Sequence, residues 1–141
     1  MSKTSASKAA PAPILAIDSA SEQAGLALFD GTTSTELSWH AGRSQTTVLL
    51  AEIQHILALN GLEPGQLGAV AATVGPGTFN GLRVGLSVAK GLVLGLDLPI
   101  IGVPTLTAAA LPFVGLGLHA APLVPAGRGR IAWSLLAPAF D

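Results

Sequence analysis

Apolar runs divide the first part of this chain into short segments. Residues 14–18 form a continuous apolar run that ends at Asp18, which is typical of a central strand buried on both faces. Residues 25–29 and 33–39 predict two further strands. The Asp-Gly pair between them, at positions 30 and 31, is a strong hairpin signal. The chain is therefore expected to begin with three strands in succession.

The next segment has the spacing of an ordinary amphipathic helix. Ser44 can cap its start, and Asn60 with Gly61 can end it in a left-handed turn. One face of this helix collects five apolar residues, which are Leu49, Leu50, Ile53, Ile56 and Leu57.

A second helix, from Gly81 to near Leu96, follows an apolar strand-like run at residues 69–74. Its polar residues gather in a stripe only about 60° wide, formed by Arg83, Ser87 and Lys90. A helix that covers one side of a sheet needs an apolar arc of only about 100°. We therefore expect this helix to bury two sides.

A ridge of small residues on the second helix suggests what the second side meets. Gly81, Gly85 and Ala89 lie at positions i, i+4 and i+8, and such a ridge lets a neighbouring helix approach closely. The neighbour can be a helix of a partner protein. The alternative is that both sides of the helix face elements of this same chain.

The rest of the chain continues the alternation of strands and helices. Residues 99–103 predict a strand, and residues 105–111 a short helix that Pro112 stops. Strand-like runs at 121–124 and 130–136 flank a Gly-Arg-Gly turn. Three adjacent strands followed by this alternation imply an α/β fold with a mixed five-stranded sheet, whose later strands are parallel and covered by helices.

The composition limits the classes of function. Half of the residues are hydrophobic and only 11% are charged, so some apolar surface is expected to meet a partner. The formal net charge of -1 gives no basic footprint for binding nucleic acid alone. Residues 98–127 carry no charged side chain, but five prolines interrupt them, and we expect no membrane span there. The absence of cysteine excludes disulfides and thiolate metal sites.

The glycine-rich turn that precedes the second helix is a candidate anion site. Its glycines, at 75, 77 and 81, fit neither G-x-G-x-x-G nor a Walker loop, and Pro76 removes one backbone donor. We expect these glycines to serve tight turning and close packing of the helix. Direct contact with a phosphate is the alternative, and its residues would be Asp18, Ser19, Gly75 and Gly77.

Asp18 itself admits two interpretations. It stands at the carboxyl end of a central strand, where open sheets bind ligands, and it could orient a phosphate or a metal-bound water. Alternatively, it accepts hydrogen bonds from the turn that follows it.

No set of residues predicts catalysis. The three histidines, at 40, 55 and 119, lack metal-ligand spacing. Ser87 lies in a near match to G-x-S-x-G, but inside a helix and not at a strand-to-helix turn. We therefore expect no catalytic residue, no metal and no cofactor in this chain.

Several spaced motifs together resemble the bacterial TsaB (YeaZ) family. They are residues 14–20, 43–45, 75–85 with 90–92, and 99–103 with 105–106. The resemblance implies an actin-like, sugar-kinase-like (ASKHA, ribonuclease H-like) subdomain over residues 14–112. Residues 113–141 would then be the start of a second, truncated subdomain. Residues 1–13 are rich in Ser, Lys, Ala and Pro, and this composition predicts a disordered tail.

The resemblance also implies a function. Members of this family are cytoplasmic, non-catalytic scaffolds in the synthesis of N6-threonylcarbamoyladenosine (t6A) in tRNA. They bind the TsaD transferase, a TsaE ATPase joins the complex, and tRNA is met only through the complex. The two long helices would form the interface with TsaD or with a second copy, through Leu49, Ile53, Gly81, Gly85, Val88, Ala89, Leu92 and Leu96.

Two departures from the family pattern accompany the resemblance. Arg43 stands where relatives often carry histidine, and the paired histidines that hold metal in TsaD have no counterpart here.

The rival hypothesis is an actin-like ATPase or small-molecule kinase that uses Asp18 and the turn from Gly75 to Gly81.

Overall fold

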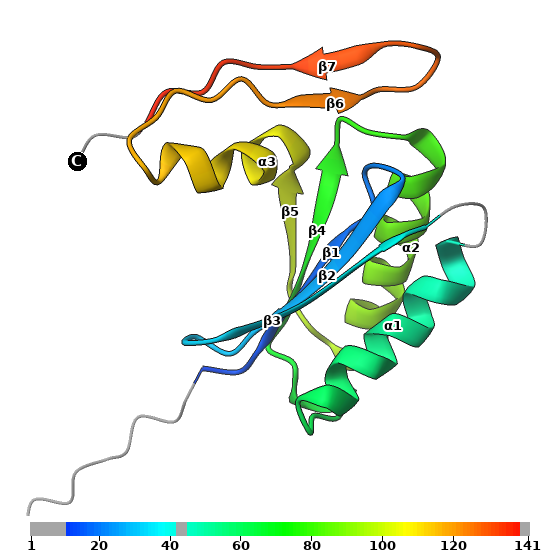
Figure 1. The fold of residues 1–141 in the computed structure, drawn as a ribbon. Coiled ribbons are helices and arrows are strands. Elements are labelled where there is room, and N and C mark those ends of the chain that lie inside the picture. Colours follow the sequence, from blue (N-terminus) through cyan, green and yellow to red (C-terminus); the bar gives the residue numbers. More distant parts are fainter. Residues whose placement is uncertain (1–10, 42–44, 139–141) are drawn as a thin grey trace, which may run out of the picture.

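The computed structural model describes residues 11–41 and 45–138 (Figure 1). Most of the expected tail, together with Arg43 and the expected cap Ser44, lies outside the described residues. Five strands form one sheet in the order β3-β2-β1-β4-β5. They are β1 (Ile14–Asp18), β2 (Gln23–Phe29), β3 (Ser34–His40), β4 (Ala69–Gly75) and β5 (Ile100–Pro104).

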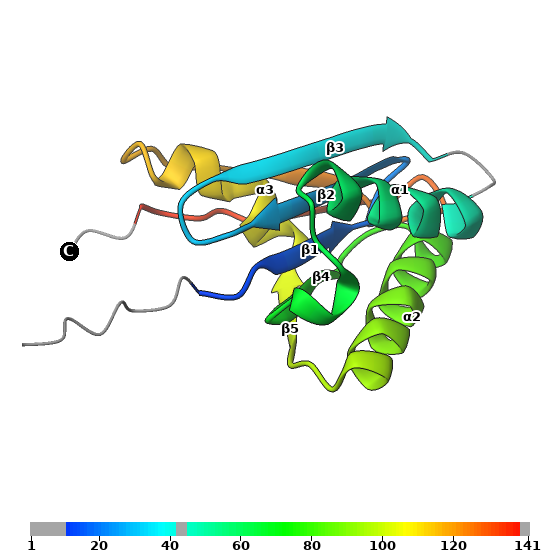
Figure 2. The ribbon, with the colours of Figure 1, turned by 90° about the horizontal axis from the view of Figure 1, so that it is seen from below.

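The strands β1, β4 and β5 are parallel to one another, whereas β2 and β3 are antiparallel to their neighbours. The expected mixed sheet is therefore confirmed. The helices are α1 (Gln45–Leu59), α2 (Phe79–Leu96) and α3 (Thr105–Val114), with a short 3-10 helix at Pro64–Gln66. Helices α1 and α2 lie on one face of the sheet and α3 lies on the other (Figures 1 and 2).

The core lies between the sheet and the pair α1 and α2. Because side chains alternate along a strand, β1 sends Leu15 and Ile17 to this face and Ala16 to the opposite one. Val70 and Ile56 complete the centre, and both are fully buried. The large side chains of the sheet are thus concentrated on one face.

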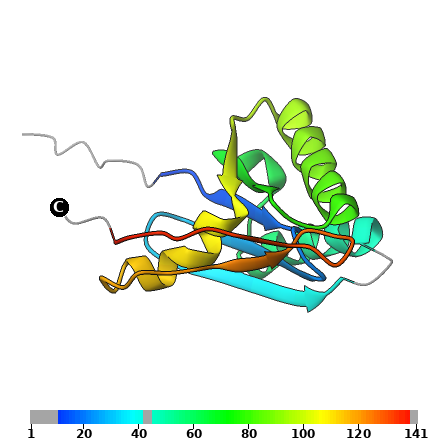
Figure 3. The same cartoon turned by 90° about the horizontal axis from the view of Figure 1, so that it is seen from above.

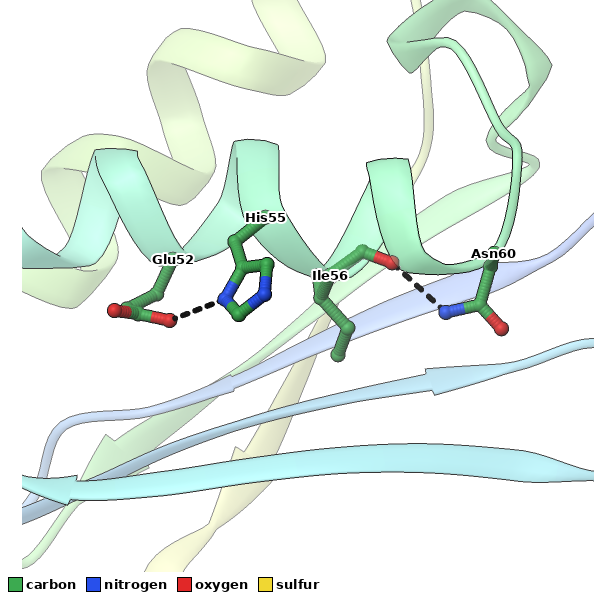
Figure 4. A network of polar contacts seen from close by, with 4 residues as sticks. All are labelled: Glu52, His55, Ile56 and Asn60. Atoms are coloured by element: carbon green, nitrogen blue, oxygen red, sulfur yellow. Dashed lines mark hydrogen bonds and ion pairs between the residues drawn. The ribbon is translucent and has the colours of Figure 1, made fainter.

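Asn60 fixes the end of α1 against the sheet. Its Nδ2 donates to the Ile56 carbonyl at 2.8 Å (Figure 4), and its Oδ1 accepts a hydrogen bond from Thr35 Oγ1 at 2.9 Å. Gly61 follows with a φ of 63°, which confirms the left-handed helix end that was predicted at this position. On the outer side of the same helix, His55 Nδ1 lies 3.2 Å from Glu52 Oε2, and an exposed pair of this kind stabilises little.

The hairpin between β2 and β3 turns on Asp30, as predicted. Its carboxylate accepts hydrogen bonds from the backbone N–H groups of Thr33 and Thr32 and from both threonine hydroxyls. These bonds hold the pKa of Asp30 well below its ordinary value, with the backbone N–H of Thr33 as the largest cause.

Helix α2 has its small-residue ridge turned inward. Gly81, Gly85 and Ala89 are buried, and Ala89 has no exposed surface. A Cβ added at Gly81 would meet the Ser19 carbonyl oxygen, and one added at Gly85 would meet the Ser19 hydroxyl. The ridge therefore packs against the end of β1 in the same chain, and not against a partner helix.

The same correction applies to two residues of α1. Leu49 and Ile53, expected at a partner interface, are buried in the core of this chain. Helices α1 and α2 contact each other, so the second side of α2 is also covered from within. Val88, Leu92 and Leu96 are half-buried and lie at the edge of this packing.

Helix α3 continues past the expected stop. It runs to Val114 with Pro112 inside it, whereas an end at Leu111 was predicted. A proline one turn from the end of a helix removes only one backbone donor, and the Gly115 N–H donates to the Leu111 carbonyl just beyond it. The last turn of the helix is therefore closed beyond the proline.

A separate two-stranded sheet crosses one end of the molecule (Figure 3). It consists of β6 (Leu123–Pro125) and β7 (Ile131–Trp133), and the predicted turn between them contains Arg128 at a φ of 53°. Its exposed side chains are large and apolar, namely Leu123, Ile131 and Trp133.

By length and composition α2 is apolar enough to cross a bilayer. In this structure it packs instead on β4 and against α1. A helix that covers a sheet on one side and a second helix on another needs the same apolar composition.

Two glycines of α2 allow a matched test of this packing. A Cβ at Gly85 would meet Ser19, whereas a Cβ at Gly91 would meet open space. We expect Gly85→Ala to lower the free energy of unfolding by about 1–3 kcal/mol through overpacking. Gly91→Ala should raise it by about 0.5–1 kcal/mol, because alanine is the better helix former. Urea unfolding measures both, and a Gly85→Ala protein of unchanged stability would contradict the inward ridge.

Candidate functional site

Asp18 lies where the carboxyl ends of β1 and β4 meet. Its Oδ1 accepts hydrogen bonds from the Ala20 backbone N–H at 3.1 Å and from Thr73 Oγ1 at 3.0 Å. The first bond closes the turn that follows β1, and the second ties that turn to β4. The carboxylate therefore has a structural role, as the interpretation of Asp18 as a cap for the following turn predicted.

Ser19 is engaged in the same junction. It is 3% exposed, and its Oγ donates to the Gly81 carbonyl at 2.9 Å. Its backbone N–H points at Thr73 Oγ1 at 3.5 Å. A hydroxyl that is buried and bonded in this way connects β1 to α2 and is not available to a ligand.

The glycine-rich turn closes onto this junction. Gly75 adopts a φ of 108°, and a Cβ added at Gly77 would collide with the Ala20 carbonyl oxygen. That oxygen accepts a hydrogen bond from the Thr78 backbone N–H at 2.7 Å. The glycines thus serve tight turning and close approach, as expected, and Thr78 donates to the chain itself.

The four residues named as phosphate contacts do come together. Asp18 and Ser19 lie beside the turn that contains Gly75 and Gly77, at one edge of the sheet. They form a packed junction, in which the Asp18 carboxylate and the Ser19 hydroxyl bond to Thr73 and Gly81. These hydrogen bonds hold the turn after β1 against strand β4 and helix α2.

The histidines are dispersed. His40 ends β3, His55 lies on the outer side of α1, and His119 precedes β6. Within the described residues, no three of the side chains His, Cys, Asp or Glu are grouped so that they could hold a metal ion.

The sequence reasoning missed a cavity on the face of the sheet opposite α1 and α2. It has a volume of about 320 Å³, and it lies between helix α3 and strand β3. Its floor is formed by Ala16, Gly25, Ala27 and Ala71, and Asp18 and Glu36 also line it. The sequence does contain a signal for this cavity. Large and small residues alternate along β1 and β2, so that the small ones share the face opposite the core.

The topology defines the class of this protein. A mixed sheet in the order β3-β2-β1-β4-β5, with α1 and α2 on one face and α3 on the other, is an actin-like α/β subdomain. Residues 39–136 match the family model of TsaD, described as tRNA N6-adenosine threonylcarbamoyltransferase. The chain belongs to this family.

Curated relatives place it near TsaB. It is 41% identical over 97 residues to the "tRNA threonylcarbamoyladenosine biosynthesis protein TsaB" of Haemophilus influenzae, covering 69% of this chain and 41% of the relative. It is 43% identical over 94 residues to the TsaB protein of Escherichia coli, covering 66% and 40%. The resemblance to the N-terminal part of TsaB proteins is therefore confirmed. The chain spans about two fifths of the length of these relatives.

A solved structure agrees on the fold. YeaZ from Pseudomonas aeruginosa superposes with a TM-score of 0.83 at 23% sequence identity, over 89% of this chain and 60% of that one. The predicted actin-like fold is therefore confirmed.

Two substitutions at Asp18 distinguish a structural role from a role of its charge. Asp18→Ala removes the acceptor for Ala20 and Thr73, and should lower the free energy of unfolding by about 0.5–2 kcal/mol. Asp18→Asn keeps an oxygen acceptor, and should change stability by no more than about 0.5 kcal/mol. Thermal and urea unfolding check both. If both variants lose stability equally, the negative charge itself is required.

Proposed function

We propose that this chain provides the N-terminal subdomain of a scaffold in t6A synthesis on tRNA, which binds and supports a TsaD-type transferase. The relatives named TsaB are described as biosynthesis proteins for this nucleoside, and the matching family model carries the name of the transferase. One observation of this structure carries the proposal of a scaffold. At the carboxyl edge of the sheet, where a catalytic member would hold its ligand, the Ser19 hydroxyl and the Gly77 turn are engaged in contacts within the chain.

The outer surface of α1 and α2 is the proposed interface. Since the small-residue ridge is internal, the contact falls to the residues that remain on the outside. Leu94 is 83% exposed on α2 and Leu50 is 47% exposed on α1, with Val88, Leu92 and Leu96 half-buried. Large exposed apolar side chains on long helices favour a helical partner. That partner is the TsaD-type subunit, or a second copy of this chain in its absence.

The other parts of the proposal follow from the same family. A TsaE-type ATPase joins the complex in the cytoplasm, and tRNA is bound only by the assembly. The chain has seven basic and eight acidic residues, so counterion release would contribute little to an autonomous contact with RNA.

An actin-like ATPase or kinase is the second candidate, because the glycine turn, Asp18 and Ser19 are adjacent. The packing of Gly77 and Thr78 against Ala20 argues against it. The donors that a phosphate would need are also engaged within the chain, because the Thr78 N–H donates to Ala20 and the Ser19 hydroxyl donates to Gly81.

The interface proposal is tested at Leu94. Leu94→Glu should weaken co-purification with a TsaD-type transferase at least tenfold, because it buries an unpaired charge at the contact. Leu116→Glu is the matched control, since Leu116 is 74% exposed outside α1 and α2, and it should bind normally. Circular dichroism checks that both variants are folded. Equal binding by the two variants would place the interface elsewhere.

The ATPase alternative is tested by calorimetry. We expect no heat of ATP binding in the micromolar range, with or without Mg²⁺, because the turn's Thr78 N–H and the Ser19 hydroxyl are engaged within the chain. Micromolar affinity that Asp18→Ala abolishes while the fold persists would establish a nucleotide site and remove the main support for the scaffold proposal.

A further inference from the structure

The chain contains two Asn-Gly pairs, and the fold places them in different surroundings. Asn60 precedes Gly61 just after the end of α1, and Asn80 precedes Gly81 in the first turn of α2. An asparagine followed by glycine is chemically labile, because no side chain on the glycine hinders the approach of its backbone nitrogen to the asparagine amide. Each pair is therefore a candidate site of spontaneous deamidation.

Hydrogen bonds hold both reacting groups of the first pair. The Asn60 amide donates to the Ile56 carbonyl at 2.8 Å (Figure 4) and accepts a hydrogen bond from Thr35 Oγ1 at 2.9 Å. The nucleophile would be the Gly61 nitrogen, whose N–H donates to the Ala58 carbonyl at 3.0 Å. Bringing this nitrogen to the Asn60 Cγ therefore breaks bonds of both groups.

The second pair is not held in this way. Asn80 is exposed, and its side chain takes part in no hydrogen bond with the described residues. Gly81 is the third residue of α2, so its N–H has no acceptor within the helix, and the Thr78 hydroxyl makes no capping bond. The amide and the nitrogen that would attack it are thus both unbonded among residues 11–41 and 45–138.

The first turn of α2 has to open before the second pair reacts, because a helical ψ keeps the two atoms apart. Opening breaks the first bonds of the helix, starting with the bond from the Leu82 N–H to the Thr78 carbonyl. The end of a helix opens locally at a much lower free energy than the core of a protein. At Asn60 the same rotation also breaks the bond to Thr35 on β3, which ties α1 to the sheet.

We propose that Asn80 is a site of spontaneous deamidation in the folded chain, and that the contacts of Asn60 protect the other pair. The Gly81 nitrogen loses its proton and bonds to the Asn80 Cγ, the Cγ–Nδ2 bond breaks, and the amide leaves as ammonia. Water then opens the succinimide ring at either carbonyl carbon, which gives aspartate or isoaspartate. This inference does not depend on the proposed scaffold function.

The two products differ in their effect on the junction between β1 and α2. Aspartate at position 80 places a carboxylate in the first turn of α2, where the helix dipole favours it, three residues before Arg83. Isoaspartate instead adds a carbon atom to the backbone just before Gly81. The Gly81 carbonyl accepts a hydrogen bond from Ser19 Oγ at 2.9 Å, and its Cα has no room for a Cβ beside the Ser19 carbonyl. Isoaspartate should therefore loosen this junction, whereas aspartate should preserve it.

The test incubates the purified full chain in mildly alkaline buffer and follows both asparagines by tandem mass spectrometry. No lysine or arginine lies between residues 44 and 82, so trypsin leaves both pairs in one peptide that ends at Arg83, and its fragment ions assign each site. In the folded chain, Asn80 should convert at least tenfold faster than Asn60. In guanidinium chloride the two rates should become similar, because no fold then protects either pair.

Thr35→Val is the matched variant, because it removes the hydrogen bond to Asn60 Oδ1. It should raise the rate at Asn60 and leave the rate at Asn80 unchanged. Asn80→Asp reproduces one product, and its urea unfolding midpoint should be no lower than that of the original chain. A sample enriched in isoaspartate should unfold at a lower urea concentration.

Three results would overturn the proposal. One is conversion of Asn60 in the folded chain as fast as that of Asn80. Another is a folded chain that keeps Asn80 intact under conditions in which the unfolded chain converts both pairs. The third is an unchanged rate at Asn60 in a folded Thr35→Val variant, because the contact with β3 would then give no protection.

Discussion

The close contact between the turn after β1 and the glycine side of α2 is the constraint on which the rest of the structure depends. With no side chains at Gly81 and Gly85, the helix approaches until the Ser19 hydroxyl can donate to a helical carbonyl. This bond fixes the rotation of α2 about its axis. Once the rotation is fixed, the apolar arc faces the sheet and α1, and Leu94 faces outward. The same contact occupies the edge of the sheet where related folds bind ligands.

Most of the fold could be predicted because its signals are local. A continuous apolar run predicted β1, the Asp30 turn predicted a hairpin, and Gly61 marked the end of α1, each from neighbouring residues. The extension of α3 past Pro112 was missed. A proline is a local signal for the end of a helix, but it does not show that the Gly115 N–H closes one more turn beyond it. The strand boundaries differ by one to three residues, because pairing with the neighbouring strand and not the apolar run alone decides where a strand ends: β2 is longer than predicted and β7 is shorter.

The candidate site was less predictable, because it depends on contacts between distant segments. The small-residue ridge was recognised, but its pattern is the same whether Ser19 of this chain or a foreign helix fills it. The cavity on the α3 face of the sheet requires the register of four strands, and Glu36 lies opposite Ala27 only once β2 and β3 have paired. The turn-capping role that was one of the two interpretations of Asp18 is seen in its bond from the Ala20 N–H. Its bond to Thr73, 55 positions away in the sequence, has no local signal.

The two tryptophans lie in contrasting surroundings, and they give this chain separate optical reporters. Trp39, on β3, packs against the core, and its Nε1 is buried with no hydrogen-bond partner among the described residues. Trp133, on β7, is 66% exposed. Emission from the first should be at shorter wavelength and shielded from acrylamide, whereas the second should be quenched freely. The intrinsic fluorescence of the unlabelled chain can therefore resolve events at the sheet from events at the β6–β7 hairpin.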